Sequence, residues 1–536
     1  MTQIIDLYGF FAVVLRGLTL TLEALSVGGV LFLLLLGGLA PSEPLVVARC
    51  RQLLRWFAAS LTGVAAGSAV LTALVLKATV EGFSWGDAVH TSFFQSYLLI
   101  AACALCLAII ARKVRAAWLL LPALSLMLGI VFTSHAFARI EERGLLLLCA
   151  GLHHLATAAW IGELPYLLIA LGRGAEPFAL RIARRFSPVA MASVGVLIVA
   201  GIVQAKALVG SVDALYGTAY GAMLMAKVVL LGLLLLMGAT NFKRLRAKIG
   251  DRSAALIVRR LVEVETAVGI TVILVASSMA SQPPAVDLTE GRATFAQIVE
   301  RFTPQSPHLQ TPPLDTLSPA TPLTEDEARR FGVPLSYTPG SGQYRPSSAG
   351  DIAWSEYNHN WSGLCVLAMG LLGLVALTPG GGWARHWPLV FLALGLFILI
   401  RADPENWPLG PRGFWESFQA PEVLQHRLAV VLVAAFAIFE WRVATGRSTR
   451  PWHALVFPAI CMLGGALLFT HTHSLGNIKE ELLAEESHTA IAIFAIVAAG
   501  ARWLQLRLPR APEALRFVWP VCFVMIGCFL TFYREA

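Results

Sequence analysis

The fold is decided by runs such as YGAMLMAKVVLLGLLLLMGATN, residues 220–241, in which Lys227 is the only charged side chain. About 20 consecutive apolar residues are needed for a helix to cross a bilayer, and continuous rather than alternating runs are typical of helices, not barrel strands. Such runs recur along all 536 residues, of which 57% are hydrophobic and 14% charged. The sequence therefore predicts an all-α, polytopic membrane protein. It excludes a soluble enzyme, a disordered chain and a small disulfide scaffold.

Fourteen such spans are predicted, eight before a polar segment rich in Pro, Ser and Thr and six after it. They lie near residues 11–36, 53–76, 94–111, 117–134, 145–171, 187–205, 220–241, 261–281, 361–378, 387–401, 422–441, 455–471, 487–501 and 517–532. The chain thus divides into an N-terminal eight-helix bundle over 1–281, a Pro-rich tether over 282–358 and a six-helix bundle over 359–536. Within the tether, helical spacing from Phe295 to Phe302 and a capping box at Thr324 predict two short helices. The first apolar run is too long for a cleavable signal.

The basic residues indicate orientation. Of the Lys and Arg in short loops and the C-terminal tail, 25 lie in alternate loops and seven lie elsewhere. Because basic loops stay in the cytoplasm, both termini and the tether are expected on the outer side. The net charge of +8 therefore reflects membrane orientation and predicts no binding to nucleic acid.

Nine of the twelve histidines are expected at the outer ends of spans. They are His90, His135, His153, His154, His359, His426, His471, His473 and His488. Any one of them is well explained as an interfacial residue that hydrogen-bonds lipid or backbone. The clustered set favours a metal, because imidazole is the commonest protein metal ligand. Imidazole with soft sulfur from residues such as Met279 suits copper, as Cu(I) or Cu(II), better than calcium or magnesium. Zinc stays open as the less favoured ion.

The histidines form one constellation in each bundle. Adjacent residues of a helix point about 100° apart, so His153 and His154 are not expected to serve one ion. His471 and His473 converge only where the helix has ended. Glu422 and Glu485 precede histidines by about one helical turn and could orient them; a solvated helix start explains both carboxylates equally well. Three or four imidazoles in the C-terminal bundle would make a closed site.

Charges within the spans are the other anomaly, because each is costly in a bilayer. Arg16 and Glu23 lie seven residues apart on one face of the first span, and we expect them to pair. Glu163 and Lys227 lie in later spans. Two interpretations stay open for this set: a polar pathway or proton relay, and buried structural pairs.

Five motifs stand out along the N-terminal bundle: Thr133-Ser-His135, His153-His-Leu-Ala-Thr-Ala-Ala-Trp160-Ile-Gly162, Tyr220-Gly221 with Lys227 and Asn241, Glu263-x-Glu265 and Ser281-x-Pro283-Pro284. They resemble the CopD family of copper-resistance membrane proteins. Longer members resemble the second bundle through Asn358-His359-Asn-Trp361, Arg401-Ala-Asp403-Pro404-Glu405, Leu424-Gln-His426-Arg427 and Thr470-His471-Thr-His473. The chain departs from the family at Glu163, where a second Gly is expected.

The resemblance implies a non-enzymatic protein of the bacterial cytoplasmic membrane that imports copper beside a small periplasmic CopC-like copper-binding partner. It assigns the family's metal-binding histidines to His135 and His153. Two alternatives remain: a haem-binding membrane oxidoreductase, since histidines on several helices could ligate haem, and a copper sensor or docking protein without transport. The absence of a Walker A motif disfavours an ATP-driven pump.

Overall fold

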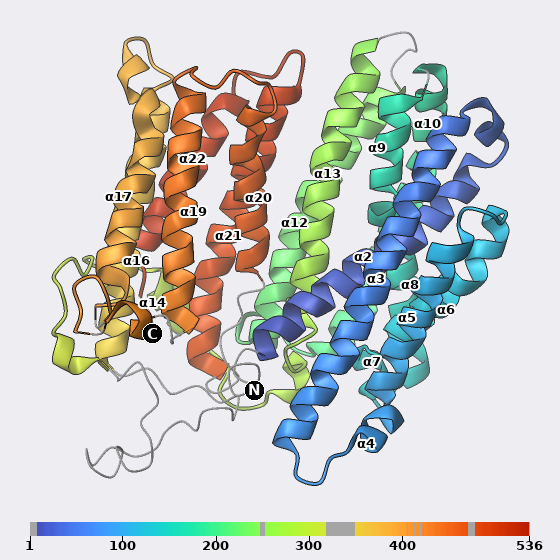
Figure 1. Ribbon diagram of the computed structural model, residues 1–536, viewed down its shortest axis with the longest axis horizontal. Helices are drawn as coiled ribbons and strands as arrows, with labels where there is room; N and C mark the ends of the chain where they lie inside the picture. The colour runs from blue at the N-terminus through green and yellow to red at the C-terminus, as the bar shows by residue number, and fades with distance from the viewer. Residues whose placement is uncertain are drawn as a thin grey trace. The chain divides into compact units, whose positions relative to one another are not determined.

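The computed structural model of the chain consists of helices joined by short turns (Figure 1). It describes residues 8–174, 176–246, 252–317, 349–404, 406–411, 413–417, 421–469 and 478–534, and this part contains no strand. The chain divides into two compact units, Met1–Arg292 and Ala293–Ala536. Each is described here by itself.

The N-terminal unit is a bundle of long apolar helices joined by short helical turns. The long helices are α2 (Tyr8–Leu36), α3 (Pro44–Thr79), α5 (Ser92–Ile110), α6 (Leu120–Val131), α8 (Arg143–Thr157), α9 (Leu164–Arg173), α10 (Glu176–Leu208), α12 (Ala219–Arg246) and α13 (Arg252–Met279). Short turns join them: η1 (Gly37–Ser42), α4 (Trp85–His90), η2 (Ala116–Leu119), α7 (His135–Ala138), α11 (Val212–Tyr216) and η4 (Ala285–Asp287). Helix α2 packs against α3, α6 and α13, so residues on it are well placed to meet several neighbours.

A π-helical turn, η3 (Ala158–Gly162), joins α8 to α9 within one long span. It packs against α2 at two glycines. A Cβ on Gly162 would lie 2.0 Å from the carbonyl oxygen of Ala24, and one on Gly28 would lie 2.4 Å from the carbonyl carbon of Gly162. Only glycine permits this approach. Single π turns are frequent at functional sites, and this one places Glu163 directly after it, with 2% of the residue exposed.

The C-terminal unit has its own helices and its own core. Its helices are α14 (Phe295–Phe302), η5 (Leu314–Thr316), α16 (Ala349–Val375), η6 (Gly381–Leu389), α17 (Val390–Phe397), η7 (Ile398–Ala402), α18 (Phe414–Ser417), α19 (Pro421–Ala444), η8 (His453–Leu455), α20 (Val456–Leu468), α21 (Ile478–Arg507) and α22 (Leu515–Thr531). Its core joins Met369, Trp387, Phe457, Trp519 and Phe523. The close packing of α16 on α22 depends on glycines, since a Cβ on Gly363 would lie 2.2 Å from the backbone nitrogen of Thr531.

The prediction of an all-α polytopic membrane protein is confirmed. Within the described residues nine helices are long and apolar enough to cross a membrane, and Ala116–Val131, His453–Leu468 and Leu515–Thr531 are shorter apolar helices. The finer count of fourteen spans, divided eight and six, stays a prediction.

The described residues that follow α13, up to residue 317, include short helices. Residues up to Arg292 belong to the N-terminal unit, and the described residues from Ala293 onward belong to the C-terminal unit. The predicted short helix at Phe295–Phe302 is α14, opened by a capping box between Thr294 and Gln297. The capping box expected at Thr324 lies outside the described residues.

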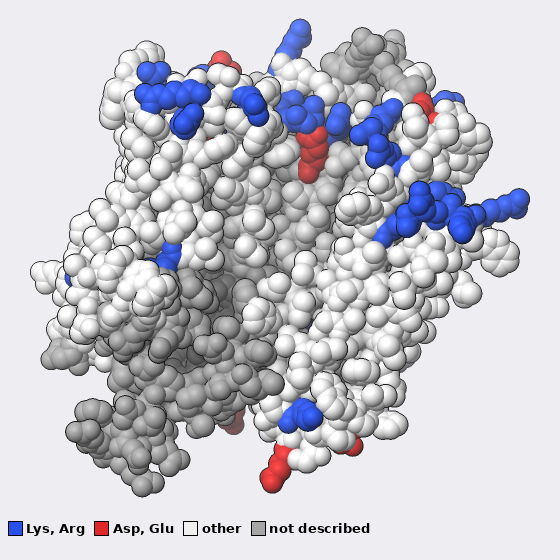
Figure 2. Space-filling view, viewed as in Figure 1, with Lys and Arg blue, Asp and Glu red and all other residues white. Residues whose placement is uncertain are grey.

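Basic side chains of the N-terminal unit gather at the end where α2, α5, α9 and α12 finish (Figure 2). This is the arrangement that the loop charges predict for a cytoplasmic face. The opposite end of this unit carries α4 and α7 (Figure 1).

Candidate metal site

Two charged residues of α2 meet different partners in the N-terminal unit. The guanidinium of Arg16 donates a hydrogen bond to the carbonyl of Thr133 at 3.0 Å. The carboxylate of Glu23 is almost fully buried and lies 3.6 Å from Nδ1 of His154. The expected Arg16–Glu23 pair is therefore wrong. Seven residues of helix rise about 10 Å, which separates the two side chains and lets each find a partner at its own level.

His135 begins α7, just beyond the end of α6. Its ring centroid lies 6.4 Å from that of Tyr220. Burial, and then the charge of Arg16, lower the pKa of His135, which keeps the imidazole neutral near pH 7. Its Nε2 is buried and has no partner among the described residues.

His153 lies on α8, next to the His154 that faces Glu23. Its Nδ1 is also buried without a partner within the described part of the chain. The ammonium group of Lys227, on α12, is close enough to act on its charge. Cys149 lies one turn earlier on α8 and is buried, so its sulfur is on the same helix face as His153.

Two further predicted pathway residues belong to this unit. Glu163 follows the π turn, and its Oε2 is buried with no partner in the described region. Met279 ends α13 and packs on a cluster that contains Tyr220, the neighbour of His135. Among the described residues, no three or more His, Cys, Asp or Glu side chains lie together in a group that could hold a metal. The polar residues of this unit therefore lie apart from one another.

In the C-terminal unit, two of the predicted ligands lie close together. The ring centroids of His359, on α16, and His488, on α21, are 6.2 Å apart. The ring of His359 also stacks on Tyr533 with centroids 4.1 Å apart, and its Nδ1 lies 2.8 Å from the carbonyl oxygen of Ser355.

His426 has a carboxylate partner that the sequence analysis did not assign to it. Its Nδ1 lies 2.8 Å from Oδ1 of Asp403, whose Oδ2 lies 3.3 Å from Nη1 of Arg427. A carboxylate on Nδ1 fixes the tautomer and orientation of an imidazole and favours metal binding at Nε2. The motif around Asp403 was already conspicuous in the sequence. Glu422, expected in this role, lies on α19 with its side chain outside the described part.

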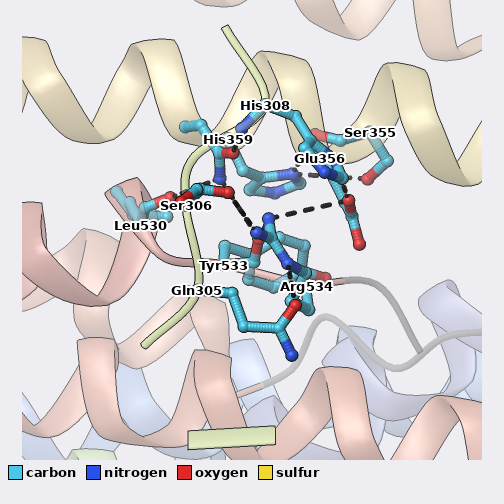
Figure 3. A network of polar contacts seen from close by, with 10 residues as sticks. Gln305, Ser306, His308, Ser355, Glu356, His359, Leu530, Tyr533 and Arg534 are labelled. Atoms are coloured by element: carbon cyan, nitrogen blue, oxygen red, sulfur yellow. Dashed lines mark hydrogen bonds and ion pairs between the residues drawn. The ribbon is translucent and has the colours of Figure 1, made fainter. Parts of the chain in front are cut away.

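A second carboxylate network was missed altogether (Figure 3). The carboxylate of Glu356 lies 2.6 Å from Nδ1 of His308 and 3.7 Å from Nη1 of Arg534. The backbone nitrogen of His308 donates to Oδ1 of Asn360, and Arg534 also donates to the carbonyl of Ser306. The segment around His308 is thus fastened to α16 and to the end of α22.

The remaining predicted ligands do not join these clusters in the described structure. His90 ends the short helix α4 and is exposed. His471 and His473 lie outside the described residues, and so does the side chain of Glu485, which is on α21. The proposed closed site of His426, His471, His473 and His488 therefore stays a prediction.

The fold and these clusters define a class: a polytopic helical membrane protein with buried polar groups inside its N-terminal bundle. Residues 180–279 match the family model described as copper resistance protein D. The predicted resemblance to the CopD family is confirmed by this segment, which the chain shares with that family.

A curated relative agrees with this assignment. The chain is 32% identical over 162 residues to the copper transport protein CutJ of Bacillus subtilis (strain 168). The match covers 30% of this chain and 29% of that relative, so it spans less than a third of the relative's length. No solved structure matches the chain.

The matched segment covers α12, α13 and nearly all of α10. It contains Lys227 and Met279, and also Asn241, whose amide donates to the buried carboxylate of Glu265 at 2.8 Å. None of the twelve histidines lies within it. The family model thus supports the helix pair α12–α13, while the roles of the histidines rest on their geometry.

Proposed function

We propose that this chain carries copper across the bacterial cytoplasmic membrane, from the outer side inward, through its N-terminal unit. Copper is the cargo, and the protein is a transporter rather than an enzyme. The family segment at 180–279 and the similarity to a copper transport protein support the cargo. The inward direction follows the usual assignment of the family that the sequence resembles.

The observation that carries the proposal is the pair of buried imidazole nitrogens without partners, Nε2 of His135 and Nδ1 of His153. A buried polar atom left unpaired costs about 1–3 kcal/mol, so such atoms are expected where a ligand supplies the missing bond. Neutral imidazole suits copper, and copper exceeds zinc in general affinity order.

The positions along α2 suggest the order in which copper meets these groups. His135 lies at the level of Arg16, near the end opposite the basic loops. The pair His154–Glu23 lies about two turns further into the bundle, beside His153. Glu163 follows at the π turn. Separate binding positions of one or two residues bind an ion weakly enough to release it, and transport through the bundle requires such release.

The positive charge of Lys227 near His153 would oppose a cation held there. We assign Lys227 the role of weakening copper binding at His153, so that the ion is released. Arg16 acts the same way near His135. Both charges are thus part of the pathway rather than incidental structural pairs.

The C-terminal unit is proposed to receive copper. The side chain of His426 is 46% exposed while Asp403 holds its Nδ1, so its Nε2 is oriented by the protein. We expect delivery by a small periplasmic copper-binding protein of the CopC kind, which requires this unit's histidines on the outer face.

The test is copper uptake by sealed proteoliposomes that contain the full-length protein. The His153→Gln variant should lower the initial rate at least tenfold. The matched control is His90→Gln, which removes an exposed histidine of the same unit and should leave uptake unchanged. If His153→Gln transports at the wild-type rate, copper does not pass through this bundle in the way proposed.

A further inference from the structure

A cavity of about 270 Å³ lies at the basic end of the N-terminal unit. Its apolar wall includes Leu33 and Leu34 from the end of α2 and Val47 from the start of α3. Arg51 and Arg115 are the charged residues of its lining. The volume corresponds to roughly nine water molecules, which is enough for a phosphate group with part of its substituent.

The two arginines of the cavity differ in what they already bind. Nη1 of Arg51 donates to the carbonyl of Val114 at 2.9 Å and also to that of Ala111, so this side chain is fixed in place. The guanidinium of Arg115 is exposed and makes no hydrogen bond or ion pair with the described residues. It is therefore available to an anion that enters beside Arg51.

Charge around the cavity is strongly one-sided. Six basic residues come from the start of α3 and the loop before η2: Arg49, Arg51, Arg55, Arg112, Lys113 and Arg115. Glu43 is the single acidic residue between positions 24 and 80, and it is not among the residues that line the cavity. An anion is thus favoured over a neutral ligand.

The surroundings place the cavity at the edge of the membrane. Trp118, two residues after the cavity-lining Ala116, is 71% exposed, and Trp56 of α3 is 67% exposed. Leu45 and Leu121 nearby are also exposed. Exposed Trp among exposed apolar residues is typical of the interface between the bilayer core and water.

We propose that this cavity binds an anionic phospholipid. Arg115 and Arg51 hold the lipid phosphate, and an acyl chain lies against Leu33, Leu34 and Val47. The apolar wall favours a lipid over free phosphate, because phosphate would leave that wall exposed to water. Basic pockets between transmembrane helices on the cytoplasmic side are suited to anionic head groups. This lipid site is independent of the copper function.

The test uses the full-length protein in a neutral detergent and measures bound lipid by native mass spectrometry. Phosphatidylglycerol should bind at least fivefold more tightly than phosphatidylcholine with the same acyl chains. Inorganic phosphate at millimolar concentration should not displace it. Equal affinity for the two lipids, or displacement by phosphate, overturns the proposal.

Variants separate the cavity from general surface charge. Arg115→Gln should lower the affinity for phosphatidylglycerol about fivefold, the effect of one basic residue near a lipid head group. Ala116→Phe keeps every charge but fills the cavity, and should lower the affinity as well. Arg112→Gln, in the same loop but away from the cavity, should change it less than twofold. If Arg112→Gln matches Arg115→Gln, or if Ala116→Phe binds like the wild type, there is no defined lipid site here.

Discussion

The histidines of the two units are held in different ways. In the N-terminal unit, Nε2 of His135 and Nδ1 of His153 are buried and unpaired within the described residues. In the C-terminal unit, Nδ1 of His308 and of His426 face carboxylates, and Nδ1 of His359 meets a backbone carbonyl. Two imidazoles of the N-terminal unit thus keep an unpaired nitrogen in the interior, although His154 of the same unit faces Glu23. Three imidazoles of the C-terminal unit are instead fixed by protein contacts.

Under the proposed function, this difference distinguishes the copper path of the N-terminal unit from the copper-receiving surface of the C-terminal unit. Unpaired buried nitrogens raise the free energy of the empty bundle and are satisfied only when an ion arrives. Imidazoles oriented by carboxylates are ready to bind before an ion arrives, and the polar contacts around them also stabilise the fold. The predictions below challenge this comparison, from the largest expected effect to the smallest.

The largest effect is expected from Gly162→Val, which should disrupt the N-terminal unit alone. The added Cβ would meet the carbonyl of Ala24, so the free energy of unfolding should fall by about 3 kcal/mol. Thermal denaturation and copper uptake of the full-length protein measure this. Gly151→Val on α8, where a Cβ meets nothing within 4 Å, is the control and should unfold at nearly the wild-type temperature.

Glu356→Gln should weaken the C-terminal unit without slowing copper transport. It removes the charge that His308 and Arg534 share, at a cost of about 2 kcal/mol in unfolding free energy. Chemical denaturation checks the stability, and vesicle uptake checks the function. Glu300→Gln, on exposed helix α14, serves as the control. A large loss of uptake with unchanged stability would place Glu356 on the copper path. It would contradict the assignment of the path to the N-terminal unit.

Asp403→Asn should lower the copper affinity of the C-terminal unit about tenfold, because loss of a carboxylate that orients a ligand typically costs this much. Copper titration of the purified protein in competition with a chelator measures the change. The copper bound by His135 and His153 should keep its affinity. Unchanged titration would mean that Asp403 serves only the packing of Arg427.

Lys227→Met should raise the copper affinity of the N-terminal unit about fivefold and slow its release, since it removes the positive charge that opposes a cation at His153. Competition titration gives the affinity, and single-turnover uptake gives the release rate. A matched change at Lys206→Met, on α10, should alter neither. Weaker binding in Lys227→Met would show that the ammonium group stabilises the site instead.

The sequence predicted those features that depend on local pattern. Apolar runs located the long helices, and the spacing of Phe295 and Phe302 located α14. Contacts between segments far apart in the sequence could not be predicted. His426 contacts a carboxylate 23 residues away, and His308 contacts one 48 residues away. Helix periodicity placed Arg16 and Glu23 on one face, but their separation along the axis prevented the expected pair. The π turn packs against α2 through Gly28 and Gly162, a contact that no single segment reveals.

The most direct test of the central claim is X-ray absorption at the copper edge on the full-length protein loaded with one equivalent of copper. In protein that carries His426→Gln, so that the copper site proposed for the C-terminal unit is removed, the account predicts imidazole nitrogen scattering that is lost when His135→Gln and His153→Gln are added. The double variant His308→Gln, His359→Gln should retain it. If the first variant keeps the wild-type spectrum and the second loses it, copper is held in the C-terminal unit, and the assignment of the path to the N-terminal unit is wrong.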